Sequence, residues 1–308
     1  MSSQPLSKEE ANTLKRRATI IAVSFATILC ILKLFGSIYT GSLSVLSSMI
    51  DSLSDILGSL VTFFAIKISS RPASETHRYG YGKAESLSAL FQAAFVAGSG
   101  LFVIYDGIKR FITPQPIDRA TAGIVIMVTS LIATIFLIIY QRYVYKRTMS
   151  QAILADSAHY TVDVLTNSSI IITLVVVKLF GWLWFDTLMA IIIAAILLYN
   201  AYDLAKKAVT TLMDVELDTS IRTKIKKIAL SYPFTKGIHD LRTRDIGGTF
   251  VFEFHLELDP KLKLFDAHEY SHQVEKGILD KYPDAQVIIH QEPAGIDDER
   301  LDHNLKRQ

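Results

Sequence analysis

The chain has 308 residues; half are hydrophobic and only 20% are charged, whereas soluble domains average about 25% charged residues. This composition excludes a disordered or fibrous chain and argues against an ordinary soluble enzyme. The formal net charge of +2 gives no sign of a nucleic-acid partner. The single cysteine, Cys30, excludes an intrachain disulfide and a cysteine-based zinc cluster. Any bound metal must therefore be held by histidine, aspartate and glutamate.

Long apolar stretches follow one another up to about residue 208, and each is long enough to cross a bilayer as a helix. The N-terminal tail and the loops after the second and fourth stretches are rich in Lys and Arg, which predicts a multi-pass protein with both termini in the cytoplasm. The first stretch lacks the cleavage pattern of a signal peptide. The six predicted transmembrane helices are Ala18–Tyr39, Leu43–Ile68, Leu87–Gly107, Thr121–Tyr140, Ala152–Leu179 and Leu183–Leu204.

After about Val209 the composition becomes that of a soluble α+β domain. Two predicted strands flank Gly247-Gly248, which is a hairpin signal, and a third strand follows a second helix. This order predicts an αββαβ domain of the ferredoxin-like or metallochaperone-like type, with an open sheet and helices on one face. The predicted segments are the helix Leu217–Tyr232, the strands Gly237–Asp245 and Thr249–Leu258, the helix Phe265–Tyr282 and the strand Ala285–Gln291.

The chain is therefore predicted to be an α-helical membrane protein with a C-terminal cytoplasmic α+β domain. We expect a cytoplasmic N-terminal tail at residues 1–17 and a six-helix transmembrane domain at residues 18–208. A cytoplasmic αββαβ domain at residues 209–296 follows, and the charged residues 297–308 should form a flexible tail.

Four ionisable residues lie inside two of the predicted spans. Asp51 and Asp55 are four residues apart, as are His159 and Asp163, so each pair lies on one face of a helix. A carboxylate at the bilayer centre costs about 2.5–3.5 kcal/mol. Neither pair contains a cationic partner. This argues against the alternative interpretation, in which the four residues only form polar contacts between helices. Asp156, near the start of the fifth span, is expected to be a helix cap or an interfacial group.

These two pairs offer one nitrogen and three oxygens, a ligand set that suits a tetrahedral divalent ion and zinc above all. Imidazole binds metal only when neutral and carboxylate only when ionised, so metal and protons compete for the same atoms. Histidine titrates within the physiological range. A site that faced each side of the membrane in turn could therefore exchange metal for protons.

Several short segments carry a family resemblance: Tyr-Thr-Gly-Ser-Leu-Ser (39–44), Gly-Lys-Ala-Glu-Ser-Leu (82–87), His-Asp-Leu-Arg-Thr-Arg (239–244) and Val-Ile-Ile-His-Gln-Glu-Pro (287–293). With the two intramembrane pairs and the αββαβ domain, they resemble the cation diffusion facilitator family, in particular its bacterial zinc and ferrous-iron efflux branch. The resemblance runs from about Leu14 to Pro293.

The resemblance implies that Asp51, Asp55, His159 and Asp163 form a transport site. Their histidine favours Zn²⁺, with Cd²⁺ and Fe²⁺ as further substrates. The family exports metal against protons by alternating access, as a homodimer in the lipid bilayer, here the bacterial inner membrane.

The resemblance also implies a binuclear zinc site in the cytoplasmic domain that steadies the dimer. Its Glu292 stands where the family pattern has Asp. The matching residues are His239, His255, His268, His290 and Glu292.

Two further family features concern the loop between the second and third spans. The branch places an Asp/His/His zinc site there, but here Ser74 and Tyr81 stand at the Asp position and at one of the His positions. Only His77 remains, so this loop site is expected to be absent or weak. Lys83 and Asp214 match a family ion pair that links the membrane and cytoplasmic domains.

Three other function classes fit the sequence less well. An intramembrane metalloenzyme would need a motif such as His-Glu-x-x-His, which the sequence lacks. A channel would hold an ion too tightly on such ligands for fast conduction. The main alternative is a membrane-anchored metal sensor, which would not need four buried ionisable residues in its anchor.

Overall fold

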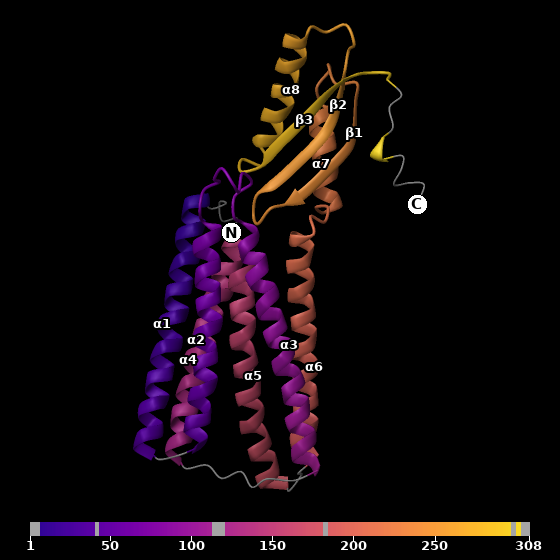
Figure 1. The fold of residues 1–308 in the computed structure, drawn as a ribbon. Coiled ribbons are helices and arrows are strands. Elements are labelled where there is room, and N and C mark those ends of the chain that lie inside the picture. The colour runs from indigo at the N-terminus through magenta and orange to yellow at the C-terminus, as the bar shows by residue number, and fades with distance from the viewer. Residues whose placement is uncertain (1–6, 41–42, 113–120, 181–183, 297–299, 303–308) are drawn as a thin grey trace. The chain divides into compact units, whose positions relative to one another are not determined.

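A computed structural model describes residues 7–40, 43–112, 121–180, 184–296 and 300–302 (Figure 1). These residues divide into two compact units: a helical unit, Met1–Val209, and a sheet unit, Thr210–Gln308. The sixth helix continues a few residues past this division. The helices of the helical unit are α1 (Lys8–Thr40), α2 (Leu43–Ser69), α3 (Lys83–Ile112), α4 (Thr121–Thr148), α5 (Gln151–Phe180) and α6 (Trp184–Leu212).

Helix α1 begins at Lys8, well before the predicted span at Ala18, and its local hydrogen bonds explain why. The Ser7 hydroxyl accepts from the Glu10 backbone N–H at 3.3 Å, and the Glu10 carboxylate accepts from the Ser7 backbone N–H at 2.9 Å. This reciprocal capping box satisfies backbone donors that a helix start leaves unpaired. The Ser7 backbone N–H and the Ser7 hydroxyl both donate to the Glu10 carboxylate, and these bonds hold the pKa of Glu10 below its ordinary value. The cap therefore extends the helix into the polar tail.

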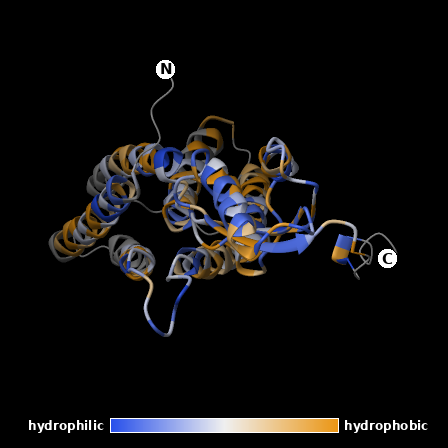
Figure 2. Ribbon diagram, turned by 90° about the horizontal axis from the view of Figure 1, so that it is seen from above, coloured by the Kyte–Doolittle hydropathy of each residue, from blue (hydrophilic) through white to orange (hydrophobic). Residues whose placement is uncertain are grey.

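Three helical segments among the described residues are long and apolar enough to cross a membrane: Lys83–Tyr105, Val128–Thr148 and Leu188–Leu212. Figure 2 shows the hydrophobic residues along the helices in orange. Large apolar side chains such as Phe35, Phe102 and Phe136 point out of the helical unit, as expected of side chains that face lipid.

Small residues fill the contacts between helices of the helical unit. Helix α1 packs against α2 and α4, and α5 packs against α2, α3 and α4. Ala89 and Ala93 of α3 are buried in one cluster with Ala155 of α5 and Ala208 of α6. Such residues let helix backbones approach closely, which is the usual basis of helix packing in membranes.

One buried carboxylate joins four segments of this unit. Glu85, at the start of α3, accepts from Lys15 Nζ of α1 at 2.8 Å and from Ser69 Oγ of α2 at 3.0 Å. It also accepts from the hydroxyl of Ser150, which immediately precedes α5. The charge of Glu85 is thus paired, and the pairing fixes the ends of α1, α2, α3 and α5 together.

The sheet unit has the predicted αββαβ order. The sheet order is β1-β2-β3, with β1 and β2 antiparallel and β2 and β3 parallel across the α8 crossover. Asp218 caps the first helix by accepting from the Ser220 backbone N–H at 2.8 Å. The elements are α7 (Thr219–Leu230), β1 (Gly237–Asp245), β2 (Phe250–Leu258), α8 (Leu264–Leu279) and β3 (Gln286–Pro293).

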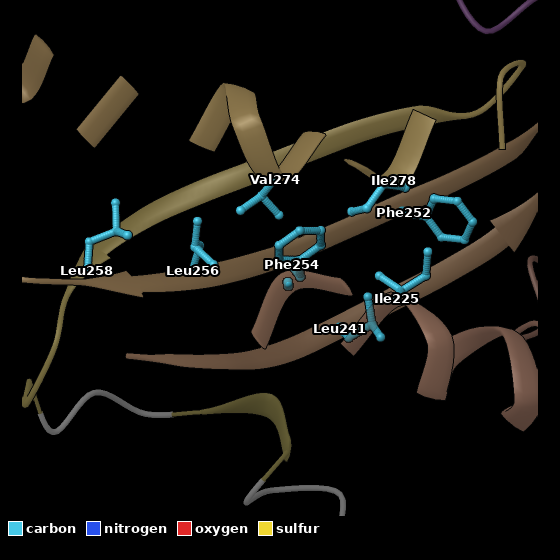
Figure 3. Close-up of a cluster of buried hydrophobic side chains, with 9 residues drawn as sticks. Ile225, Leu241, Phe252, Phe254, Leu256, Leu258, Val274 and Ile278 are labelled. Carbon is cyan, nitrogen blue, oxygen red and sulfur yellow. The ribbon is translucent and has the colours of Figure 1, made fainter. Parts of the chain in front are cut away.

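The core of the sheet unit lies between one face of the sheet and both helices (Figure 3). Phe252, Phe254 and Leu256 alternate along β2 and are fully buried against Ile225 of α7 and Val274 of α8. Because successive strand residues point to opposite faces, the residues between them point away from the helices. That second face carries the polar residues described below.

Replacing Phe254 by alanine should lower the free energy of unfolding of the sheet unit by about 3–5 kcal/mol, because it opens a cavity in this core. Hydrogen exchange of the β2 amides in the purified full-length protein would measure the change. Ile288, which lies on the other face of the sheet and is 44% exposed, provides the control: Ile288→Ala should cost about 0.5 kcal/mol or less. Equal losses in the two variants would contradict this description of the core.

Candidate metal centres

The first candidate centre lies between α2 and α5. His159 Nε2 is 3.0 Å from Asp55 Oδ1, and both side chains are buried, with 7% and 9% of their residues' surface exposed. Asp163 lies one helical turn beyond His159. One ligand atom from each of the three residues lies within 4.8 Å of the other two. The helices therefore bring the Asp55 carboxylate to His159 and Asp163, although Asp55 is far from both in the sequence.

Asp51, the fourth residue of the predicted quartet, lies in α2 one turn before Asp55. Its side chain lies outside the described part of the structure. The structure thus brings three of the four predicted residues together, and the assignment of the fourth stays a prediction.

The arrangement is suited to exchange between a proton and a metal ion. A hydrogen bond joins His159 Nε2 and Asp55 Oδ1, so a divalent ion that bound these two atoms would displace its proton. The His159 ring is held edge-on by Phe95 of α3, with the ring centres 5.7 Å apart. The nitrogen and oxygen donors fit borderline ions such as Zn²⁺.

Asp156 is not a helix cap, which corrects that expectation from the sequence, and its assignment as an interfacial group stays a prediction. It lies more than one turn inside α5 and is 1% exposed. Its carboxylate accepts from Gln141 Nε2 of α4 at 2.6 Å and from Ser59 Oγ of α2 at 3.2 Å. The cap expectation was wrong because α5 begins at Gln151, so Asp156 lies inside the helix rather than just before its first turn.

The second candidate centre is a row of histidines across the sheet unit. His239 of β1 pairs in register with His255 of β2, and His255 pairs with His290 of β3. The ring centres are 5.0 Å apart for the first pair and 4.7 Å for the second. Strand register therefore sets the spacing of this row on the sheet face that the helices leave uncovered.

Glu292 connects the three histidines. Its Oε1 is 2.5 Å from His255 Nδ1 and 3.7 Å from His290 Nε2, and its Oε2 is 3.1 Å from His239 Nε2. Two groups with ligand atoms in reach of one another share His255: one with His290 and Glu292, the other with His239 and Asp240. A carboxylate that touches all three imidazoles suits one ion or two adjacent ions.

The sequence prediction missed two acidic residues beside this row. Glu257 lies two residues after His255 on the same face of β2, with Oε1 3.2 Å from His239 Nδ1. The period-2 pattern that paired His290 with Glu292 would have found it. Asp240 had no such signal, because β1 is irregular between His239 and Arg242 and Asp240 has a φ of 50°.

Residues 300–302 of the C-terminal segment contact these two acids. Arg300 Nη2 is 2.8 Å from Glu257 Oε1. The Asp240 carboxylate accepts from the backbone N–H groups of Leu301 and Asp302, each at 2.9 Å. Burial alone would raise the pKa of Asp240, but these bonds, with the nearby histidines, hold it below its ordinary value.

Other predicted site residues lie apart from these clusters. His268 is on α8, where its ring stacks with His272 at 6.4 Å. In the loop after α2, Ser74 Oγ is 3.0 Å from Tyr81 Oη, and the exposed His77 stacks on Tyr81 at 4.4 Å. The two replaced family positions thus bond to each other, and the weak His77 assignment stays a prediction.

The predicted pair of Lys83 and Asp214 would join the helical and sheet units, and it also stays a prediction. Within the sheet unit, Asp214 Oδ2 lies 3.7 Å from Arg244 Nη1.

Comparison with known protein families finds a match for each of the two domains of the chain. Residues 19–213 match the cation efflux transmembrane domain, and residues 217–294 match the cytoplasmic domain of cation efflux proteins. Together these matches cover both candidate centres.

Relatives align over nearly the whole chain. The cation-efflux pump FieF of Escherichia fergusonii is 41% identical over 280 residues, which is 91% of this chain and 93% of that protein. FieF of Klebsiella pneumoniae is 40% identical over the same shares. Among solved structures, the metal-bound C-terminal domain of the CzcD transporter from Thermotoga maritima is similar to 27% of this chain and to all of that domain, with 27% identity and a TM-score of 0.25.

Replacing Glu292 by glutamine should weaken zinc binding to the sheet unit at least about tenfold, because one carboxylate contacts all three histidines. Equilibrium dialysis of the full-length protein against a competing chelator would measure this. Binding should also weaken as the pH falls, because protons compete with the metal ion for the imidazole and carboxylate atoms.

His272→Ala is the matched control, because His272 is exposed on α8 and pairs with Glu275. Zinc binding that responds equally to both substitutions, or to neither, would contradict the assignment of the histidine row.

Proposed function

This chain belongs to the cation diffusion facilitator family and is a divalent-metal efflux transporter, and we propose that Zn²⁺ is its main cargo, with Cd²⁺ and Fe²⁺ as further substrates. We further propose that it exports metal from the bacterial cytoplasm across the inner membrane in exchange for protons. Its membership rests on the two family matches and on relatives 41% identical over 91% of the chain. It is a multi-pass membrane protein with a cytoplasmic C-terminal domain, and not an enzyme.

The observation that carries the proposed cargo is the buried cluster of Asp55, His159 and Asp163. Asp51, one turn before Asp55 on α2, is proposed as the fourth ligand. Four donors of this kind suit the tetrahedral preference of zinc. The imidazole favours zinc over harder ions such as Mn²⁺, which prefer oxygen ligands alone.

Proton exchange follows from the same atoms. The Asp55–His159 contact at 3.0 Å is a hydrogen bond that must give up its proton when metal binds. Outside the cell, protons would return to these atoms as the metal leaves. Alternating access of the helical unit would then carry metal outward and protons inward.

The cytoplasmic centre is proposed to bind zinc that is not transported. His239, His255, His290 and Glu292 supply it within one chain. The match of the sheet unit to the cytoplasmic domain of cation efflux proteins and the resemblance in sequence support a homodimer. The cytoplasmic centre is proposed to stabilise that dimer. His268, which lies outside the cluster of one chain, stays a proposed additional ligand.

A membrane-anchored metal sensor is the second candidate function, because the sheet unit brings its own metal ligands together. The intramembrane cluster favours transport. A buried carboxylate destabilises a helical bundle unless a cation, a proton or several hydrogen bonds compensate its charge. A passive anchor would not need two carboxylates and a histidine that converge from two helices.

Zinc flux into proteoliposomes with a trapped zinc dye tests the transport proposal. We expect zinc uptake that becomes faster when a proton gradient directed out of the liposomes is imposed, with Cd²⁺ and reduced Fe²⁺ as competitors. Asp163→Ala should reduce the rate at least about a hundredfold, because it removes one ligand from the site.

Asp203→Ala is the control, since Asp203 is an exposed carboxylate of α6 that pairs with Lys207 at 2.7 Å; its flux should equal that of the wild type. If wild-type flux matched that of empty liposomes while the protein still bound zinc, zinc transport would be refuted and the sensor function favoured.

A further inference from the structure

A second polar contact between α2 and α5 lies one helical turn from the proposed transport site. Asp156 of α5, Ser59 of α2 and Gln141 of α4 are each 0–1% exposed. The Asp156 carboxylate accepts from Ser59 Oγ at 3.2 Å and from Gln141 Nε2 at 2.6 Å. Both donors are neutral, so this carboxylate is held by hydrogen bonds that tie three helices together.

The Asp156 network lies about one helical turn from the metal cluster along both α2 and α5. Ser59 follows Asp55 by one turn on α2, and Asp156 precedes His159 by about one turn on α5. The contact of Asp55 with His159 and that of Ser59 with Asp156 are therefore successive links between the same two helices. Any slip of α2 along α5 would break both.

Tyr160 strengthens the second link. Its hydroxyl is 2.8 Å from Ser59 Oγ, and because the single Ser59 proton is donated to Asp156, Tyr160 must be the donor. The Tyr160 ring packs edge-on against Phe25 of α1, with ring centres 6.3 Å apart. Tyr160 also adjoins His159 in sequence, so the network ends beside a proposed ligand.

On the basis of the proposed function, we propose that Asp156 is a positioning residue for metal binding. Through Ser59 and Tyr160 it holds α2 and α5 in the register that presents Asp55 and His159 to one ion. Metal sites tolerate displacements of only about 0.5 Å in their ligands, so loss of this network should lower metal affinity without removing a ligand.

The two obvious substitutions at this position separate hydrogen bonding from charge. In Asp156→Asn, the amide oxygen can still accept from Ser59. If the Gln141 amide turns over by 180°, the NH₂ group of the asparagine can donate to Gln141 Oε1, which has no hydrogen-bond partner among the described residues. In Asp156→Ala, both bonds are lost.

The test is zinc uptake by proteoliposomes over a range of zinc concentrations. Asp156→Ala should raise KM by about 10–100-fold with a smaller change in kcat, and Asp156→Asn should restore KM to within about threefold of the wild type. Ser59→Ala should raise KM in the same direction and serves where Asp156→Ala does not fold. Thermal unfolding in detergent identifies the variants that fold.

The inference is overturned if KM is unchanged in both Asp156→Ala and Ser59→Ala, or if Asp156→Asn is as impaired as Asp156→Ala. The second result would mean that the charge itself binds metal or protons. The flux of Asp55→Ala and that of the wild type are measured in parallel. Equal flux in these two proteins would refute the proposed transport function rather than the role of Asp156.

Equilibrium zinc binding decides the inference independently of flux. It is measured on full-length protein that carries His255→Ala, which weakens the cytoplasmic centre. Addition of Asp156→Ala should weaken the remaining zinc binding by about 10–100-fold; unchanged binding overturns the inference.

Discussion

The cost of burying ionisable groups among membrane helices is the constraint on which the rest of this structure depends. A carboxylate in such a place needs a cation, a proton or several hydrogen bonds. The helical unit uses each solution at a different site. Glu85 is paired with Lys15, Asp156 accepts from neutral side chains, and Asp55 shares a proton with His159. Only the third arrangement leaves atoms that can exchange a proton for a metal ion.

This difference separates the structural carboxylates from the proposed transport site. Glu85 and Asp156 are bonded by groups from neighbouring helices, so they hold the bundle in place. Asp55, His159 and Asp163 converge from two helices, and their contacts depend on the relative position of α2 and α5. The cytoplasmic centre instead lies on a three-stranded sheet, where backbone register fixes the row of histidines. We infer that the rigid centre serves to hold zinc and the one between helices serves to move it.

Periodicity explains how much of this the sequence could predict. The αββαβ order followed from helical periodicity, the strand patterns and the hairpin signal at Gly247-Gly248. The spacing of four placed His159 and Asp163 on one face of α5, whereas their convergence with Asp55 was implied only by the family resemblance. The alternation of strand residues between the two faces of the sheet would also have predicted Glu257 beside His255. Asp240 could not be predicted in this way, because its place in the row depends on an irregularity in β1 and on a positive φ. The network of Asp156 was also beyond prediction, because its partners lie on two other helices, α2 and α4, and only tertiary packing joins them.

The central claim is that metal and protons exchange on the same buried atoms, and a record of the pH inside sealed proteoliposomes tests it most directly. With a trapped pH-sensitive dye and no imposed gradient, zinc added outside should raise the internal pH as zinc enters and protons leave. The change should disappear in Asp55→Ala, because that variant loses the carboxylate that shares a proton with His159. Zinc uptake by the wild type without any change in internal pH, when the membrane potential is clamped, would contradict the account.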